Sequence, residues 1–171
     1  MQFPAINRCK LHKDYISTHK NTIIVIDIKN FTYYNEIYGQ DIGDFIIKKC
    51  MQALDAISIE HRCNSYRIAG DLFALMYTNT KITYDNLLNN IKDIFVCIKD
   101  MQICGSFINE EIVCDVTLGI AYAQENALTK AEIALKHAKE KRNNFFIYST
   151  SLDKNSNHNQ VIYWQKKYLK V

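Results

Sequence analysis

The chain has 171 residues, of which 48% are hydrophobic and 23% are charged, and its formal net charge is +3. This length suits one domain with a sizeable core, and the composition is typical of a globular protein rather than a disordered one. The small positive charge does not indicate nucleic-acid binding, and no apolar run approaches the ~20 residues that cross a bilayer. Residues 1–4 lack the basic start and apolar core of a signal peptide.

The cysteines and histidines argue against a disulfide framework and against a histidine metal site. Six cysteines occur without a C-x-x-C pair, and most lie inside apolar runs. We therefore expect buried, reduced thiols in a cytoplasmic protein. The five histidines are scattered and have no metal-ligand spacing.

The first elements are a helix, a buried strand and a second helix. The first helix is predicted over residues 7–16. Residues 22–28 form a β-branched apolar run, which is typical of a central strand, and Asp27 places a carboxylate at its exit. Residues 31–38 have helical spacing, and Gly39 is expected to end this helix as a C-cap.

The next segment predicts a turn, a helix and a hairpin. After a turn at residues 41–43, Asp44 stands at a helix start, where a carboxylate satisfies unpaired backbone N–H groups. The apolar stripe of residues 45–57 predicts an amphipathic helix. Residues 65–77 predict two strands around a tight turn that contains Gly70, which tolerates positive φ.

The second half of the chain continues the alternation of helices and strands. Its predicted elements are a helix over 81–98, a hairpin of 103–108 and 112–123 turned at 109–111, a helix over 128–142 and a strand over 145–148. In the helix over 128–142 we expect Ile133, Leu135 and Ala138 to face the core. The element order predicts an α/β (α+β) sandwich, with a largely antiparallel central sheet flanked by helices.

The C-terminal residues differ in composition from the rest. Residues 149–159 are polar and rich in Asn and Ser, as in a linker, whereas residues 161–171 combine aromatic and apolar side chains with three lysines. We therefore divide the chain into a domain over 1–149 and, over 150–171, a linker with the start of a helix. That helix either leads into a neighbouring domain or packs back on the first one.

Several motifs occur in a fixed order along the chain. They are N-R-x-x-L near the start, IVIDIKNF, N-x-x-Y-G-x-x-I-G-D, R-x-A-G-D-L-F, VTLGIAYA and KAEIALKHAKEKRNN. In this order they resemble the GGDEF domain, the family of diguanylate cyclases, over residues 7–148. These enzymes condense two GTP into cyclic di-GMP, and their fold resembles the palm of nucleotidyl cyclases and polymerases.

The resemblance implies a Mg²⁺ site formed by Asp27, the Ile28 carbonyl and Asp71, with Asp71 also the acid that remains in the catalytic signature. Mg²⁺ takes hard oxygen ligands, usually one or two carboxylates with phosphates and water. From the residues alone, Asp27 could instead cap the helix over 31–38. Asp71 could likewise bond its own backbone in the turn.

The resemblance also implies a guanine-nucleotide site. Asn35 and Asp44 fall on the positions that read the Watson–Crick edge of guanine. Lys139 matches a phosphate-binding lysine, and Arg67 matches the arginine before the signature turn. Without the motifs, Asn35 is a polar helix-face residue, Asp44 a helix cap and Lys139 a solvated charge.

The signature itself departs from the family pattern. Ala69 replaces a glycine and adds a methyl where a nucleotide approaches closely. Leu72 replaces a glutamate that is needed for activity, and a leucine can neither accept nor bond the proton of a sugar hydroxyl. Lys29 replaces the second acid of the family's D-x-D and brings a positive charge near the metal position.

Further departures affect the phosphate contacts and the inhibitory site. Thr32 replaces a phosphate-binding lysine, and Asn143 stands where an arginine is usual, although Arg142 is adjacent. Residues 60–63 lack the R-x-x-D of the family's inhibitory site, so we expect no product inhibition of that type.

These observations lead to three hypotheses. The first is a degenerate GGDEF domain that binds GTP or another guanine nucleotide with Mg²⁺ and signals to an adjacent EAL-type domain or partner protein, without efficient cyclisation. The second is an active diguanylate cyclase that works as a homodimer. The third is an interaction module with an empty pocket.

Overall fold

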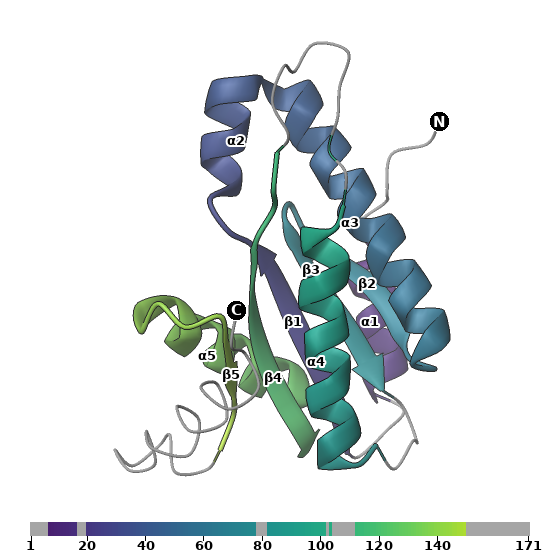
Figure 1. The fold of residues 1–171 in the computed structure, drawn as a ribbon. Helices are drawn as coiled ribbons and strands as arrows, with labels where there is room; N and C mark the ends of the chain where they lie inside the picture. The colour runs from purple at the N-terminus through teal and green to yellow at the C-terminus, as the bar shows by residue number, and fades with distance from the viewer. Residues whose placement is uncertain (1–6, 17–19, 78–81, 102, 104–111, 150–171) are drawn as a thin grey trace.

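The computed structural model describes residues 7–16, 20–77, 82–101, 103 and 112–149 (Figure 1). The helices are α1 (Arg8–Ile16), α2 (Phe31–Tyr38), α3 (Gln40–Glu60), α4 (Tyr84–Lys99) and α5 (Ala127–Glu140). The strands are β1 (Asn21–Ile28), β2 (Asn64–Ala69), β3 (Leu72–Tyr77), β4 (Val116–Gln124) and β5 (Phe145–Ile147). The predicted turn at 109–111, the predicted strand over 103–108 except its first residue, and the tail over 150–171 lie outside the described residues.

The described strands form one sheet in the order β2-β3-β1-β4-β5. β1 pairs antiparallel with both β3 and β4, β2 pairs antiparallel with β3, and β5 runs parallel to β4. All eight residues of β1 are buried, because the strand has a neighbour on each side and helices over each face. The predictions of a central first strand and of a largely antiparallel sheet are confirmed.

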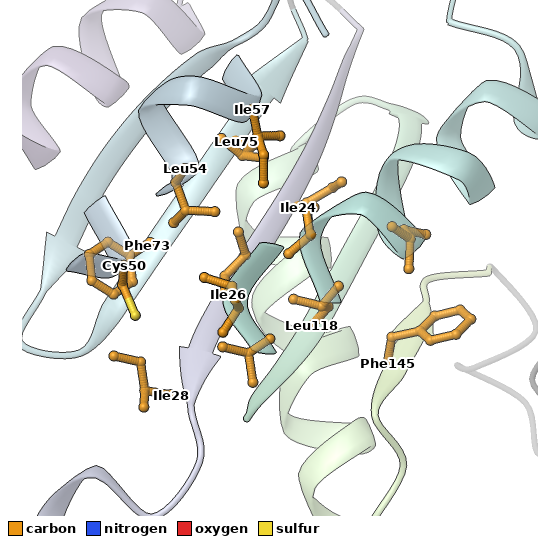
Figure 2. Close-up of a cluster of buried hydrophobic side chains, with 14 of the residues drawn as sticks. Ile24, Ile26, Ile28, Cys50, Leu54, Ile57, Phe73, Leu75, Leu118 and Phe145 are labelled. Carbon is orange, nitrogen blue, oxygen red and sulfur yellow. The ribbon is translucent and has the colours of Figure 1, made fainter. Parts of the chain in front are cut away.

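One face of the sheet packs against α3 and α4 (Figure 1). Figure 2 shows Ile24, Ile26 and Ile28 in a row along β1, because alternate residues of a strand point to the same face. They meet Cys50, Leu54 and Ile57, which recur at helical spacing on α3 (Figure 2). This core anchors the end of β1 at Ile28, which lies next to Asp27.

The other face of the sheet packs against α1 and α5. Here Ile23 and Val25 of β1 contact a cluster that includes Leu11 of α1. α5 contributes small residues, Ala127 and Ala131 among them, so the helix lies close to the strands. The site described below therefore has one helical layer on each side.

Three details of the predicted elements are wrong. Residues 41–43 are helical rather than a turn, because Gly39 (φ +86°) breaks the chain and α3 starts immediately after it. β4 begins at Val116 rather than at residue 112, and Ile112 forms only an isolated antiparallel bridge with Ile103.

The third error is Ile133, which is 46% exposed, because the sheet-facing side of α5 is the row that contains Ala131, Leu135 and Ala138. Leu135 and Ala138 do face inward as predicted. The cysteines also differ in part: the described cysteines are free thiols, but Cys9 is exposed. Within the described part of the chain, the helices are too short or too polar to cross a membrane.

Candidate functional site

Asp27 lies at the exit of β1 and is the acid around which the site is arranged. The preceding Ile and Val residues hold the strand inside the core, and Asp27 itself is only 9% exposed. Lys139 reaches it from the last turn of α5, where its Nζ donates a hydrogen bond to Asp27 Oδ1 at 2.5 Å. Asp27 is therefore an ion-pair partner and not the cap of α2, whose N-cap is Asn30.

The surroundings of Asp27 make this carboxyl harder to ionise than an exposed one. Burial raises the pKa of this carboxyl, the hydrogen bond and charge of Lys139 lower it, and the negative charge of Asp71 raises it again. Burial is the main cause of the raised pKa, and the smaller effect of Asp71 indicates a second carboxylate near Asp27 at this end of the sheet. A cation in the site would relieve the repulsion between the two carboxylates.

Asp71 is brought to Asp27 by the β2–β3 hairpin. Gly70 takes positive φ (+30°) in the two-residue connection, as the sequence predicted. The backbone N–H of Ile28 then donates to the Asp71 carbonyl oxygen at 3.4 Å, which holds the turn against the exit of β1. In the same register Leu72 pairs with Asp27, and Leu72 packs its side chain into the α1–α5 cluster.

Arg67 is buried beneath the hairpin turn, with 5% of its surface exposed. Its Nε donates to the Gly70 carbonyl oxygen at 2.9 Å, which fixes the turn from below. Burial lowers the pKa of Arg67, and the charges of Asp44 and Asp71 oppose that shift. Arg67 therefore lies close enough to Asp71 in the hairpin and to Asp44 in α3 to interact with both charges.

Asn35 and Asp44 lie where α2 meets α3. The side chain of Asn35 rests against Gly43, where a Cβ atom would come within 1.8 Å of Asn35 Oδ1. Asp44 is the next residue of α3 and is exposed. It lies in the second turn of the helix, whose N-cap is Gly39, so the interpretation of Asp44 as a helix cap is wrong. Asn35 and Asp44 therefore lie in the same region of the structure, with Gly43 between them along the contact of α2 and α3.

An open cleft of about 420 Å³ adjoins the Asp27–Lys139 pair. Its lining residues come from the ends of β1, β4 and α5, and they are Asp27, Lys29, Asn30, Thr117, Lys139, Arg142 and Asn143. Lys139 is consequently not a freely solvated charge. The cleft has the mixed cationic and hydrogen-bonding character that suits a phosphorylated ligand.

Sequence reasoning missed some of the residues around this cleft. Thr117 is a buried polar residue in an otherwise apolar strand. This break in the apolar pattern is the sequence feature that could have identified the wall of the cleft. Asn144 and Asp115 hold Lys29, whose Nζ is 2.7 Å from Asn144 Oδ1 and 3.7 Å from Asp115 Oδ2. Both lie far from Lys29 in sequence, and no local pattern connects them.

The donor chemistry fits one Mg²⁺ ion. Asp27, Asp71 and the carbonyl of Ile28 are hard oxygen donors at the same end of the sheet, and Mg²⁺ needs few protein ligands when phosphates and water complete its shell. No group of three or more His, Cys, Asp or Glu residues is arranged for a metal in the described part of the chain. Lys29 lines the cleft where the family pattern would supply another acid, and its positive charge opposes a second cation there.

A mostly antiparallel sheet with helices on both faces, and with strand-exit and hairpin acids side by side, defines a nucleotidyl-cyclase-like α/β domain. The family model described as "Diguanylate cyclase, GGDEF domain" matches residues 7–145. The chain belongs to the GGDEF family of cyclic di-GMP signalling, as its motifs predicted.

Solved structures have the same fold at low sequence identity. The GGDEF domain of DgcB from Caulobacter crescentus, in complex with c-di-GMP, has a TM-score of 0.65 at 17% identity, over 82% of this chain and 84% of that one. The active GGEEF domain of a Vibrio cholerae diguanylate cyclase has a TM-score of 0.65 at 18% identity, over 88% and 100%. An EAL/GGDEF domain protein from M. capsulatus has a TM-score of 0.65 at 21% identity, over 81% and 94%. A comparison with the curated proteins found no match.

Proposed function

We propose that this domain binds GTP, or another guanine nucleotide, as a regulatory input and does not cyclise it efficiently. The observation that carries the proposal is the continuity of the site. Asn35 contacts Gly43, the neighbour of Asp44. The charges of Asp44 and Asp71 both act on Arg67, and the charge of Asp71 also acts on Asp27, which pairs with Lys139 beside the cationic cleft. A base and its phosphates would extend along this line.

Each group has a chemical role in binding. The amide of Asn35 and the carboxylate of Asp44 supply a donor, an acceptor and an anionic acceptor for the edge of guanine. Lys139 provides a cation for the phosphates. Arg67, the other predicted nucleotide-binding cation, is buried and would contribute by holding the Gly70–Asp71 turn in place. Asp27, the Ile28 carbonyl and Asp71 would hold one Mg²⁺, which would neutralise charge on the triphosphate. Lys139 would then exchange its partner, from Asp27 to a phosphate oxygen.

The same site is poorly equipped for cyclisation. Leu72 stands opposite Asp27, where the family has a glutamate, and its side chain is committed to packing. A hydrocarbon cannot accept a proton from the attacking hydroxyl. Loss of one stabilising group in a transition state typically costs ~10²–10³ in rate.

A second candidate is an active homodimeric diguanylate cyclase. It is favoured by the retention of Asp27 and Asp71, which are adjacent at the site. A nucleotide-free interaction module is the third outcome of the test below. For the adjacent partner we propose an EAL-type domain, by analogy with the EAL/GGDEF relative, and for the location we propose the cytoplasm, which suits free thiols.

The test is a calorimetric titration of GTP with Mg²⁺, together with a parallel assay for cyclic di-GMP. Asp44→Ala should reduce GTP affinity by roughly tenfold or more, because a carboxylate–guanine hydrogen bond is charge-assisted. Asp41→Ala is the matched control, since Asp41 is an exposed acid one turn earlier in α3. Binding without product supports the proposal, product formation supports the cyclase, and an unchanged Asp44→Ala isotherm removes the guanine assignment.

A further inference from the structure

The cleft beside Asp27 has an excess of positive charge. Its lining side chains include three cations, Lys29, Lys139 and Arg142, and a single carboxylate, Asp27. Lys139 already pairs with that carboxylate at 2.5 Å. Of the other two cations, Lys29 has only a long ion pair with Asp115, which does not line the cleft, so the open cleft keeps an excess of positive charge that suits a multiply charged anion.

Lys29 is held in place at the rim of the cleft. Its Nζ donates to Asn144 Oδ1 at 2.7 Å, and its backbone N–H donates to the Asp115 carbonyl oxygen at 2.8 Å. These contacts tie the lysine to the residues that immediately precede β4 and β5. Its side chain is 30% exposed, so the ammonium is positioned by the protein and still accessible from the cleft.

The ion pair between Lys29 and Asp115 is weak enough to be displaced. The two charged atoms are 3.7 Å apart, which is too long for a hydrogen bond, and the Asp115 side chain is 65% exposed. An ammonium group has three N–H donors, and Asn144 takes one of them. An entering phosphate could accept another while the Asp115 carboxylate moves into water.

We propose that Lys29 is a built-in cation that binds the polyphosphate of the ligand, so that this cleft can hold a di- or triphosphate group even before Asp27, the Ile28 carbonyl and Asp71 bind Mg²⁺. Lys29 and Arg142, which Asp27 does not neutralise, would supply part of the positive charge that an ion would otherwise supply. The inference rests on the proposed function for the identity of the nucleotide. The part of the inference that concerns phosphate binding depends only on the cleft and its charges, and not on which nucleotide binds.

The experiment titrates the whole chain with inorganic tripolyphosphate and with GTP, each in excess EDTA and in Mg²⁺. Tripolyphosphate should bind in EDTA, and Lys29→Gln should weaken it by roughly tenfold or more, the effect of a charge-assisted hydrogen bond. The matched control is Lys136→Gln, since Lys136 is an 81% exposed lysine on α5 and should not change the affinity. Asp115→Asn removes the competing carboxylate and should tighten binding several-fold.

The outcomes separate this inference from the proposed function. If GTP binds only with Mg²⁺, or if Lys29→Gln binds tripolyphosphate in EDTA as well as the natural chain does, the inference is overturned and the proposed function stands. If tripolyphosphate binds in EDTA through Lys29 but GTP binds under neither condition, the inference stands and the proposed function fails. If Lys29→Gln does not fold, Lys29→Arg and Asp115→Asn provide the test. Retained binding of tripolyphosphate by Lys29→Arg and tighter binding by Asp115→Asn support the inference. Unchanged binding by Asp115→Asn contradicts it.

Discussion

Asp27 is an ionisable residue at a buried position of β1 where an apolar side chain would be expected. It continues the α5-facing row of Ile23 and Val25 on β1, and burial alone makes its ionised form unfavourable. Lys139 and a bound cation are the groups that offset this cost. A residue that destabilises the fold and meets a cleft is typical of a site kept for binding.

We predict that Asp27→Asn is more stable than the natural chain at neutral pH. Burial raises the pKa of Asp27 above its ordinary value of 3.8, so the folded state holds the proton more tightly than the unfolded state. Its contribution to stability is therefore complete below pH 3.8 and is lost as the pH rises through the raised pKa. Melting temperatures measured from pH 3 to pH 8 should coincide at the acidic end and separate as the pH rises.

Asp41→Asn provides the comparison for that measurement, because Asp41 is exposed at the start of α3. Its melting curve should follow the natural chain at every pH. A difference for Asp27→Asn that is constant with pH, or that favours the natural chain at pH 8, would contradict the prediction.

The helices reach their positions because two glycines allow close approach. Gly43 lets α3 lie against α2, where its neighbours are Asn35 Oδ1 and the ring of Phe31. Gly119 lets α5 lie on β4, and a Cβ there would come within 2.2 Å of the Ala131 carbonyl oxygen and 2.3 Å of the Leu135 nitrogen. A Cβ atom at Gly43 would meet the end of the Asn35 side chain, whereas a Cβ atom at Gly119 would meet the backbone of α5.

We predict opposite consequences for alanine at these two positions. Gly43→Ala should displace the Asn35 side chain and abolish GTP binding, while changing the free energy of unfolding by only about 1 kcal/mol, because helix propensity offsets the strain. Gly119→Ala should destabilise the protein by about 3 kcal/mol or more, because backbone cannot move aside. Denaturant unfolding and GTP calorimetry measure both, and normal GTP binding by Gly43→Ala would contradict the role given to Asn35.

At the scale of the whole molecule, the proposed site joins both helical layers across the end of the sheet. Lys139 comes from α5 on one face, whereas Asn35 and Asp44 come from α2 and α3, towards the other (Figure 1). A ligand that contacts all three would bind the folded state and not the unfolded chain. Its binding should therefore stabilise the domain as a unit.

We predict that GTP raises the melting temperature more than ATP does. At a concentration a hundredfold above its Kd, a ligand adds about 2.7 kcal/mol to the unfolding free energy, or roughly 5–10 °C for a domain of this size. ATP should give a smaller shift, since adenine does not match the Asn35–Asp44 pair. Equal shifts for the two nucleotides would mean that binding depends on the phosphates alone.

Much of the fold could be predicted because the decisive signals are local. The β-branched run of β1 and the glycine turn of the β2–β3 hairpin both lie where the sequence placed them. The start of α3 was missed because Gly43 resembles a turn residue. Gly43 instead makes room for the Asn35 side chain, and this requirement arises only once α2 and α3 are packed together.

The sequence by itself determined the strand and helix order, the family, and which side chains were candidates for the site. Only the tertiary structure decided that Lys139 pairs with Asp27, 112 positions away in the sequence, and that Asn144 and Asp115 hold Lys29. The physical reason is that periodicity and turn propensity act over a few residues, whereas charges pair wherever the packed sheet and helices bring their atoms together.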